Sequence, residues 1–409
     1  MGTTAMKFGN VNILDLQNAT EESIAGVESM GNVNLIFHNR ATAGLIKHIK
    51  IGNINRMLEM PEKVKILQRQ GQVVINKDFF TTLNEPTVLV VMGQLIIESG
   101  VTPEVVGESF KGLIVMGQAL YPEAMAGVIE SHTLVLLGQG NAYPALKTFV
   151  QGKLVMSQAY LNGLADQSEI IVVGDLTLPK VVDDQQLRRK LAKLFVVGDL
   201  ICHEENVAAI QAALVKEAKA LEIVPAGFEL VEQPLSLDND MLDALPSKNL
   251  YCKQRVIFGG DVTVENLESR LGRLVCCGLL IAPAGLKPVL AKRVNLFETQ
   301  AIFFIGKLLL AENEDTLGAA RLEAMKEPFT LVVSGELSIQ PDAPLDDLDR
   351  LVLKAHNFGQ IRGSAAQIAL LQNRLGIQKG ELLIDKPHED ENEEENKPGV
   401  IGNVNYLAL

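Results

Sequence analysis

Short apolar runs that end in a glycine recur along the whole chain. Early examples read FGNVNILDL from Phe8, MGNVNLIFH from Met30 and IGNINRMLE from Ile51, and later ones include VVMGQLII, LIVMGQAL, IVVGDLTL and FFIGKLLL. Runs of Val, Ile, Leu and Phe this short predict strands. The segments between them often have helical spacing, as in residues 185–194, where leucines recur on one face. The pattern therefore predicts strands alternating with short helices.

The glycines of these runs define a period. Gly9 to Gly31 is 22 residues, Gly117 to Gly138 is 21, and the spacings of consecutive units range from 19 to 29. Consecutive strands that are separated by a crossover pair in parallel, and such crossovers are right-handed. One unit cannot bury its apolar face alone, but stacked units share a core. The sequence thus predicts an α/β fold, a right-handed solenoid of about fourteen strand-turn-helix repeats.

Over about residues 8–385 this pattern resembles the leucine-rich-repeat solenoids, which carry strands on one side and short helices on the other. Their LxxLxLxxN signature is replaced here by three apolar residues, a glycine and Asn, Gln or Asp. The VVGDL and FGGDV units also resemble the bactofilins, whose coils lack helical halves, and this likeness ranks second. The first resemblance implies a strand face that binds proteins. The second implies end-to-end self-assembly.

The period fails once, over the 61 residues between Gly198 and Gly259. We therefore expect an N-terminal solenoid arm (residues 1–202), a helical insertion (203–250) and a C-terminal arm (251–385). The insertion either packs against the arms or serves in dimerisation or docking. An acidic linker (386–398) and a terminal repeat-like peptide (399–409) follow.

The terminal peptide repeats the first motif of the chain, because IGNVNYLAL from Ile401 matches FGNVNILDL from Phe8. It follows a stretch, Asp385–Lys397, with seven acids and two bases. The fourteen residues 385–398 extend over at most about 48 Å, whereas a straight stack of fourteen coils is about 65 Å long. We therefore expect the peptide to add as a strand near an end of the array, on its own C-terminal coil or on a neighbouring molecule, rather than to reach Phe8. A disordered tail with a chance match is the alternative.

The residue after each glycine is usually an amide or an acid. Stacked coils would place these side chains in a column in which amides bond to neighbouring coils, as we expect for Gln94, Gln118 and Gln139. A metal-binding row of acids is the alternative reading. The predicted ladder consists of Asn10, Asn32, Asn53, Gln72, Gln94, Gln118, Gln139, Asp175, Asp199 and Asp261.

The apolar triplets before the glycines do not alternate with polar residues. Alternate strand residues point to opposite faces, so either both faces are covered by the protein or one face is an exposed stripe that binds a partner. With three positions of the terminal peptide, the candidate interaction residues are Val91, Val115, Leu136, Val172, Val196, Phe304, Val404, Tyr406 and Leu407.

Composition narrows the function further. Of 409 residues, 47% are apolar and 21% are charged, with a net charge of −13, as expected of a folded chain of two or three domains or one repeat array. The acidic charge and 5% aromatic content disfavour nucleic-acid binding. No apolar stretch reaches the roughly 18 residues of a membrane helix. The four cysteines lack a CxxC pair, which favours a reducing, cytoplasmic setting.

Catalytic patterns are scarce in the sequence. His203, Glu204 and Glu205 follow Cys202, which is more typical of a surface turn than of a metal site, and Cys276-Cys277 lies in a strand triplet. We therefore expect no enzyme, no metal and no cofactor. The favoured function is a non-enzymatic scaffold or self-assembling structural protein that contacts other proteins or itself. A monomeric module that binds a peptide or protein on its strand face ranks second, and a cryptic enzyme third.

Overall fold

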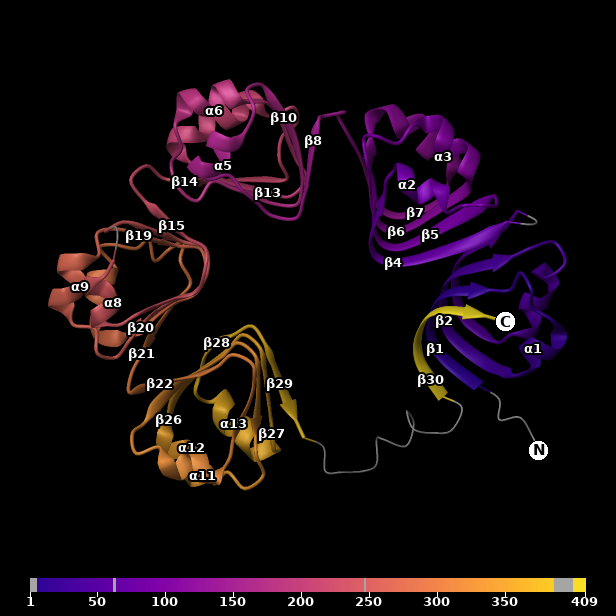
Figure 1. The fold of residues 1–409 in the computed structure, drawn as a ribbon. Coiled ribbons are helices and arrows are strands. Elements are labelled where there is room, and N and C mark those ends of the chain that lie inside the picture. The colour runs from indigo at the N-terminus through magenta and orange to yellow at the C-terminus, as the bar shows by residue number, and fades with distance from the viewer. Residues whose placement is uncertain (1–5, 62–63, 246–247, 386–399) are drawn as a thin grey trace. The chain divides into compact units, whose positions relative to one another are not determined.

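A computed structural model describes residues 6–61, 64–245, 248–385 and 400–409. The described residues up to Phe149 form one compact unit together with β30 (Val400–Ala408), and those from Val150 to Asp385 form a second. The predicted α/β class is confirmed, with many parallel strands in several small sheets (Figure 1). Within each unit the strands form short stacks, which we call blocks.

The first unit contains blocks A and B, each a four-stranded parallel sheet with the helices between its strands. Block A has the strand order β3-β2-β1-β30 and comprises β1 (Met6–Asp15), α1 (Glu21–Ala25), β2 (Val27–His38), η1 (Ala43–His48), β3 (Ile51–Glu59) and β30. Block B has the order β4-β5-β6-β7 and comprises β4 (Lys65–Ile75), α2 (Lys77–Thr81), β5 (Thr87–Ile97), α3 (Pro103–Ser109), β6 (Phe110–Pro122), η2 (Glu123–Met125), α4 (Ala126–His132) and β7 (Thr133–Tyr143).

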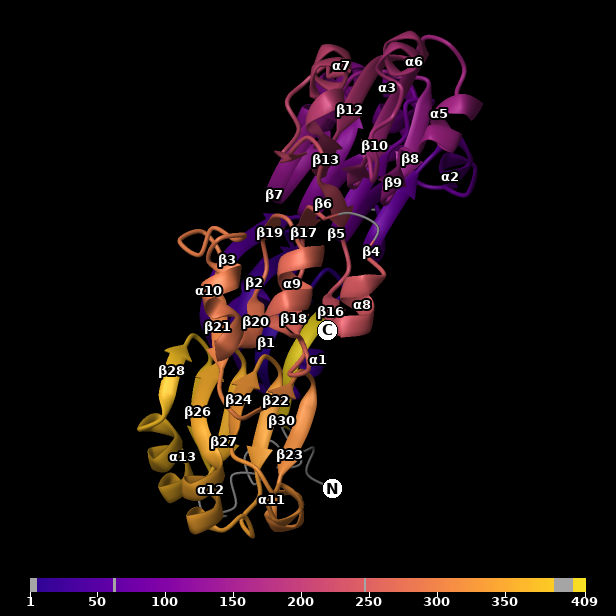
Figure 2. The same cartoon turned by 90° about the vertical axis from the view of Figure 1, so that its left-hand side faces the viewer.

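In the second unit most turns of the repeat carry two short strands, so each block has two parallel sheets. Figure 2 shows β22, β24, β26 and β28 of one such sheet side by side. Block C comprises β8 (Thr148–Gln151), β9 (Leu154–Val155), α5 (Gln158–Gly163), β10 (Ser168–Val173), β11 (Leu176–Thr177), α6 (Asp184–Lys190), β12 (Leu191–Val196), β13 (Asp199–His203), η3 (Glu204–Asn206), α7 (Val207–Ala213) and β14 (Ala220–Val224).

Blocks D and E follow the same plan. Block D comprises β15 (Glu229–Val231), β16 (Leu235–Leu237), α8 (Asn239–Asp243), β17 (Leu250–Cys252), β18 (Val256–Phe258), α9 (Val264–Arg270), β19 (Leu274–Cys276), β20 (Leu280–Pro283), η4 (Ala284–Leu286), α10 (Lys287–Leu290) and β21 (Ala301–Phe304). Block E comprises β22 (Lys307–Ala311), β23 (Glu314–Leu317), α11 (Ala319–Ala324), β24 (Phe329–Val333), β25 (Glu336–Ile339), α12 (Leu345–Leu351), β26 (Val352–Asn357), β27 (Gln360–Gly363), α13 (Ala365–Gln372), β28 (Leu375–Gln378) and β29 (Glu381–Ile384).

The recurring glycines stack directly on one another. Gly93 and Gly117 occupy paired positions of β5 and β6, and a Cβ built on Gly117 would lie 2.0 Å from the carbonyl oxygen of Gly93. In block A a Cβ on Gly31 would lie 2.4 Å from the carbonyl oxygen of Gly9. The carbonyl of the neighbouring strand thus occupies the space that any other side chain needs, which explains the glycine in the motif.

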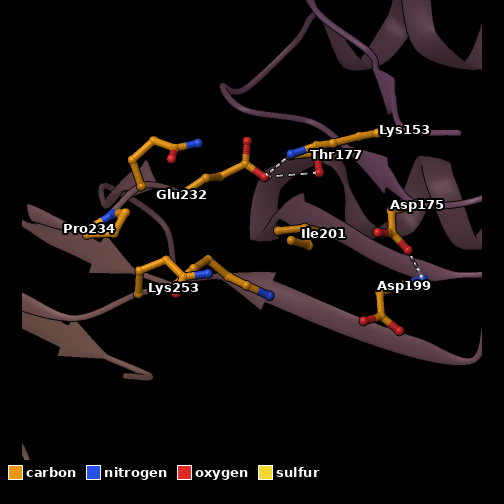
Figure 3. Close-up of a pocket in the computed structure, with 10 residues that line it drawn as sticks. Lys153, Asp175, Thr177, Asp199, Ile201, Glu232, Pro234 and Lys253 are labelled. Atoms are coloured by element: carbon orange, nitrogen blue, oxygen red, sulfur yellow. Dashed lines mark hydrogen bonds and ion pairs between the residues drawn. The ribbon is translucent and has the colours of Figure 1, made fainter. Parts of the chain in front are cut away.

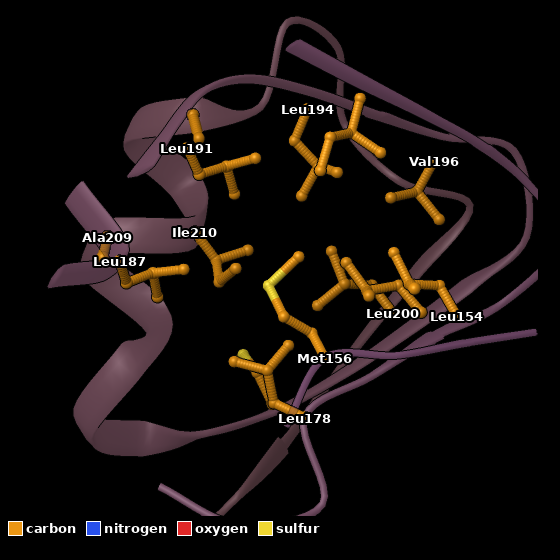
Figure 4. Close-up of a cluster of buried hydrophobic side chains, with 14 of the residues drawn as sticks. Leu154, Met156, Leu178, Leu187, Leu191, Leu194, Val196, Leu200, Ala209 and Ile210 are labelled. Atoms are coloured by element: carbon orange, nitrogen blue, oxygen red, sulfur yellow. The ribbon is translucent and has the colours of Figure 1, made fainter. Parts of the chain in front are cut away.

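Each block has an inner core between its strands and its helices. In block C, Figure 4 shows Met156, Leu178, Leu194 and Leu200 pointing toward Leu187 and Ile210 of the two helices α6 and α7. Each of these residues is at most 1% exposed. At roughly 25 cal/mol per Å² of apolar surface, burial of this kind is what stabilises such short helices.

The outer faces of neighbouring blocks in one unit pack together. Ile13 and Leu35 of block A form a cluster with Val88 and Ile114 of block B. In the second unit, similar clusters join Ile201 of block C to Tyr251 of block D, and block D to block E around Val332. This second layer explains why the triplets are apolar on both faces.

Most of the candidate interaction residues on the strand faces are buried in the described part of the chain. Val91, Val115, Val172, Val196 and Phe304 are each at most 5% exposed, because inner cores or joints between blocks cover them. Leu136 is 37% exposed, since it lies on β7, the last strand of its sheet.

The segment 203–250 corrects a second expectation. It carries α7 and α8 but also strands, so it is not a helical insertion: β14 pairs with β13, β15 with β17 and β16 with β18. These strands continue the stacks without the apolar-glycine-polar motif, which is why the period failed there. The division between the two compact units falls within β8 instead, between Phe149 and Val150.

Candidate strand-docking site

The last strand of the chain pairs with the first. β30 lies parallel to β1, with Asn403 opposite Asn10, Val404 opposite Val11 and Leu407 opposite Leu14 (Figure 1). The expectation that the terminal peptide would not reach the N-terminal repeat was wrong. Its length estimate assumed one straight stack, whereas the repeats form several short blocks. The predicted acidic linker 386–398 lies outside the described residues.

Two rows of asparagines connect β30 to block A. In the first row, Asn32 donates from Nδ2 to Asn10 Oδ1 and Asn10 donates to Asn403 Oδ1, both at 2.8 Å. The second row, Asn55 to Asn34 to Asn12 to Asn405, has amide distances of 2.7, 2.8 and 2.9 Å. Both rows donate in the same direction, so each amide polarises the next along the row.

The second row was not predicted, although its signal is present in the sequence. The motif reads G-N-V-N or G-N-I-N in all four strands, and residues i and i+2 of a strand share a face. Asn53 departs from the predicted column, because its Nδ2 donates to Asn55 Oδ1 within β3.

Apolar and polar anchors fix the other end of β30. Val404, Leu407 and Leu409 pack against the inner core of block A, which contains Val11 and Leu14. The Tyr406 hydroxyl donates to the carboxylate of Asp15, which is 8% exposed. Burial, reinforced by this carboxylate, raises the pKa of Tyr406, so the phenol stays a hydrogen-bond donor at neutral pH. The backbone N–H of Leu409 donates to the Asp15 carbonyl at 3.0 Å.

The glycines of this pair are not equivalent. A Cβ on Gly9 would lie 2.6 Å from the carbonyl oxygen of Gly402, whereas a Cβ on Gly402 would meet nothing within 4 Å. The β1 edge therefore requires its glycine to accept β30, while the incoming strand does not require its own.

Comparison with protein-family models, with curated proteins and with solved structures found no match.

The predicted glutamine column lies in block B. Gln72 donates to Gln94, and Gln94 Nε2 donates to Gln118 Oε1 at 2.8 Å. Gln139 lies opposite Gln118 in the strand register. The acids bond to backbone instead: Asp175 accepts from the N–H of Asp199 at 2.9 Å.

Asp261 likewise accepts from the N–H of Asn239 at 3.1 Å. Within the described residues no group of three or more His, Cys, Asp or Glu side chains is arranged to hold a metal ion.

Replacing Gln118 with leucine should lower the free energy of unfolding by about 1 kcal/mol, because Gln94 loses its acceptor while Gln118 is only half-buried. Gln139→Leu, at the exposed end of the same column, is the matched control and should change it by less than about 0.5 kcal/mol. Urea unfolding of both variants measures the difference. Equal midpoints for Gln118→Leu and the wild type would argue against a stabilising column.

A polar pocket of about 370 Å³ lies between blocks C and D in the second unit (Figure 3). Lys153 Nζ and Glu232 Oε1 form an ion pair across it at 2.5 Å, and Lys253 pairs with Glu222. Thr177 Oγ1 lies 3.4 Å from the same Glu232 oxygen. Each of these ion pairs joins a residue of block C to a residue of block D. We therefore interpret the pocket as part of the structural contact between the two blocks.

The local cluster of His203 and Glu204 next to Cys202 is similarly engaged. His203 is 3% exposed and its Nε2 lies 3.2 Å from the Pro179 carbonyl, while Glu204 accepts from the N–H of Ala226. Burial raises the pKa of Cys202 and Cys276 to about 11 and that of Cys252 to about 12. These thiols are protonated at neutral pH and are poor nucleophiles.

Across the part of the chain that the structure describes, no helix is both long and apolar enough to span a membrane.

Proposed function

We propose that this chain is a non-enzymatic scaffold that acts through protein–protein contacts, and that the edge of β1 is its strand-accepting surface. The pairing of β30 with β1 carries the proposal. A segment almost 400 residues away in sequence is recognised there by backbone pairing, two asparagine rows and a tyrosine–aspartate bond. Strand addition of this kind takes its affinity from main-chain bonds and its specificity from alternate side chains.

The fold in this proposal is a right-handed solenoid that resembles the leucine-rich-repeat proteins. Helices between parallel strands support it, because such crossovers are right-handed in nearly all proteins. The number of glycine motifs, about fourteen, is then a lower bound on the number of repeats. β14 and β16 join their stacks although they lack a glycine motif. The same helices weigh against a bactofilin-like coil.

The alternatives have less support. Burial of Val91, Val115 and Val172 weighs against recognition on the strand face. The protonated thiols and the ion-paired pocket weigh against a cryptic enzyme. A cytoplasmic setting belongs to the proposal, supported by four cysteines that are free thiols.

The test is binding of a labelled peptide, residues 399–409, to a chain truncated after Pro398, followed by fluorescence anisotropy. We expect saturable binding. A peptide with Asn403→Ala and Asn405→Ala loses two amide bonds of about 1 kcal/mol each and should bind roughly 30-fold more weakly.

Should the truncated chain not fold alone, co-refolding with the peptide and gel filtration gives the same answer. Absence of binding to a folded truncated chain, or equal affinity for both peptides, would contradict a specific strand-accepting edge.

A further inference from the structure

We propose that β30 is an exchangeable strand whose partner in trans is the β1 edge of a second copy of this chain. The inference rests on the proposed function, because it names the partner of the same edge. Two copies that exchange their C-terminal strands would form a closed, two-fold dimer.

The contacts of β30 lie within the first unit, mainly on block A, and Tyr406 also packs against the cluster that joins blocks A and B. Asn403 and Asn405 accept from Asn10 and Asn12, Tyr406 donates to Asp15, and Val404 and Leu407 pack on one inner core. None of these contacts depends on which copy supplies the strand. A reciprocal exchange therefore keeps every contact and changes only the connectivity.

The balance between the two forms depends on concentration. A tethered strand has an effective concentration on the order of millimolar, so the closed monomer dominates in dilute solution. Exchange is favoured where copies are crowded or refold together.

The β7 edge is another apolar surface that could accept a partner, since Leu134 and Leu137 are 37% and 46% exposed. Nothing in the structure shows what covers this edge.

The variant Gly9→Ala yields a chain that can donate its own β30 but cannot accept a strand at β1. The new Cβ collides with the Gly402 carbonyl, and all three of its nearest atoms belong to Gly402. This full-length variant keeps an intact β30 but has a blocked β1 edge. It is the strand donor.

The acceptor is the full-length double variant Val404→Asp with Leu407→Asp. It places two charges where apolar side chains pack on the core of block A, so its own strand no longer docks while β1 is unchanged. Circular dichroism checks that both variants are folded.

Light scattering after gel filtration gives the result. Each variant alone should have the mass of a monomer, 44.4 kDa, and an equimolar mixture should show a species of twice that mass. A donor that also carries Gly402→Ala should still dimerise, because that position is open. A mixture that remains monomeric overturns the proposal, and so does a Gly9→Ala variant that oligomerises alone, because its strand then binds elsewhere.

Wild-type chains provide a second measurement that does not depend on the variants. Light and isotopically heavy chains are refolded together at high concentration and examined by native mass spectrometry. A dimer of mixed mass supports strand exchange, and monomers alone overturn it. If the peptide 399–409 binds the truncated chain while no dimer forms, the result supports the strand-accepting edge of β1. It contradicts only the proposed exchange between two copies.

Discussion

Gly117→Ala should destabilise block B by about 4 kcal/mol or more, which is among the largest effects a single substitution produces. Two causes act together. The backbone of Gly117 has φ +146°, which other residues rarely adopt, and the added Cβ would lie 2.0 Å from the Gly93 carbonyl oxygen. Relief requires β5 and β6 to separate, which breaks a continuous parallel pairing.

The matched control lies in the same glycine column. Gly71 also has a positive φ, +80°, but a Cβ there meets nothing within 4 Å, because β4 is the first strand of its sheet. Gly71→Ala should therefore cost only the backbone strain, about 1–2 kcal/mol. Chemical unfolding with hydrogen exchange over β5 and β6 compares the variants. Equal losses for both would mean that backbone strain alone, and not strand stacking, explains the glycine.

The motif was sufficient to predict parallel strands but not how they are grouped. Apolar triplets such as Ile171-Val172-Val173 indicate that both faces of a strand are buried. The same sequence pattern results whether a helix, a flanking segment or another block covers the outer face. Where a strand lacked the motif, as in β14 and β16, its place in the stack comes from pairing with neighbours, β13 and β18, that a local pattern does not reveal.

The docking site shows the same limit. The GNVN motif of the terminal peptide indicated a strand that belongs with the early repeats, and its asparagines do align with Asn10 and Asn12. The sequence did not identify which edge is open. That edge belongs to β1, because β2 and β3 follow it on the opposite side of the same sheet.

Truncation of the chain after Pro398 should remove protection from amide exchange in block A and leave block B largely protected. Without β30 the sheet ends at β1, and Phe8 and Val11, which are 5% and 1% exposed, lose the cover of Val404 and Leu407. Two half-buried apolar side chains and two amide bonds at about 1 kcal/mol each amount to a loss on the order of 4 kcal/mol.

The expected pattern is selective because the two blocks have separate inner cores. The core of block B, around Val91 and Val115, contains no residue of β30, whereas that of block A packs against Val404 and Leu407 of β30 and against Leu409, which follows it. Exchange monitored by mass spectrometry should therefore show faster labelling of β1 and β2 at unchanged rates in β5 and β6. Full-length Gly402→Ala is the control and should label like the wild type. Full protection of β1 in the truncated chain would show that β30 does not stabilise block A. The hydrogen bonds of its asparagines and of Tyr406 would then contribute no measurable free energy.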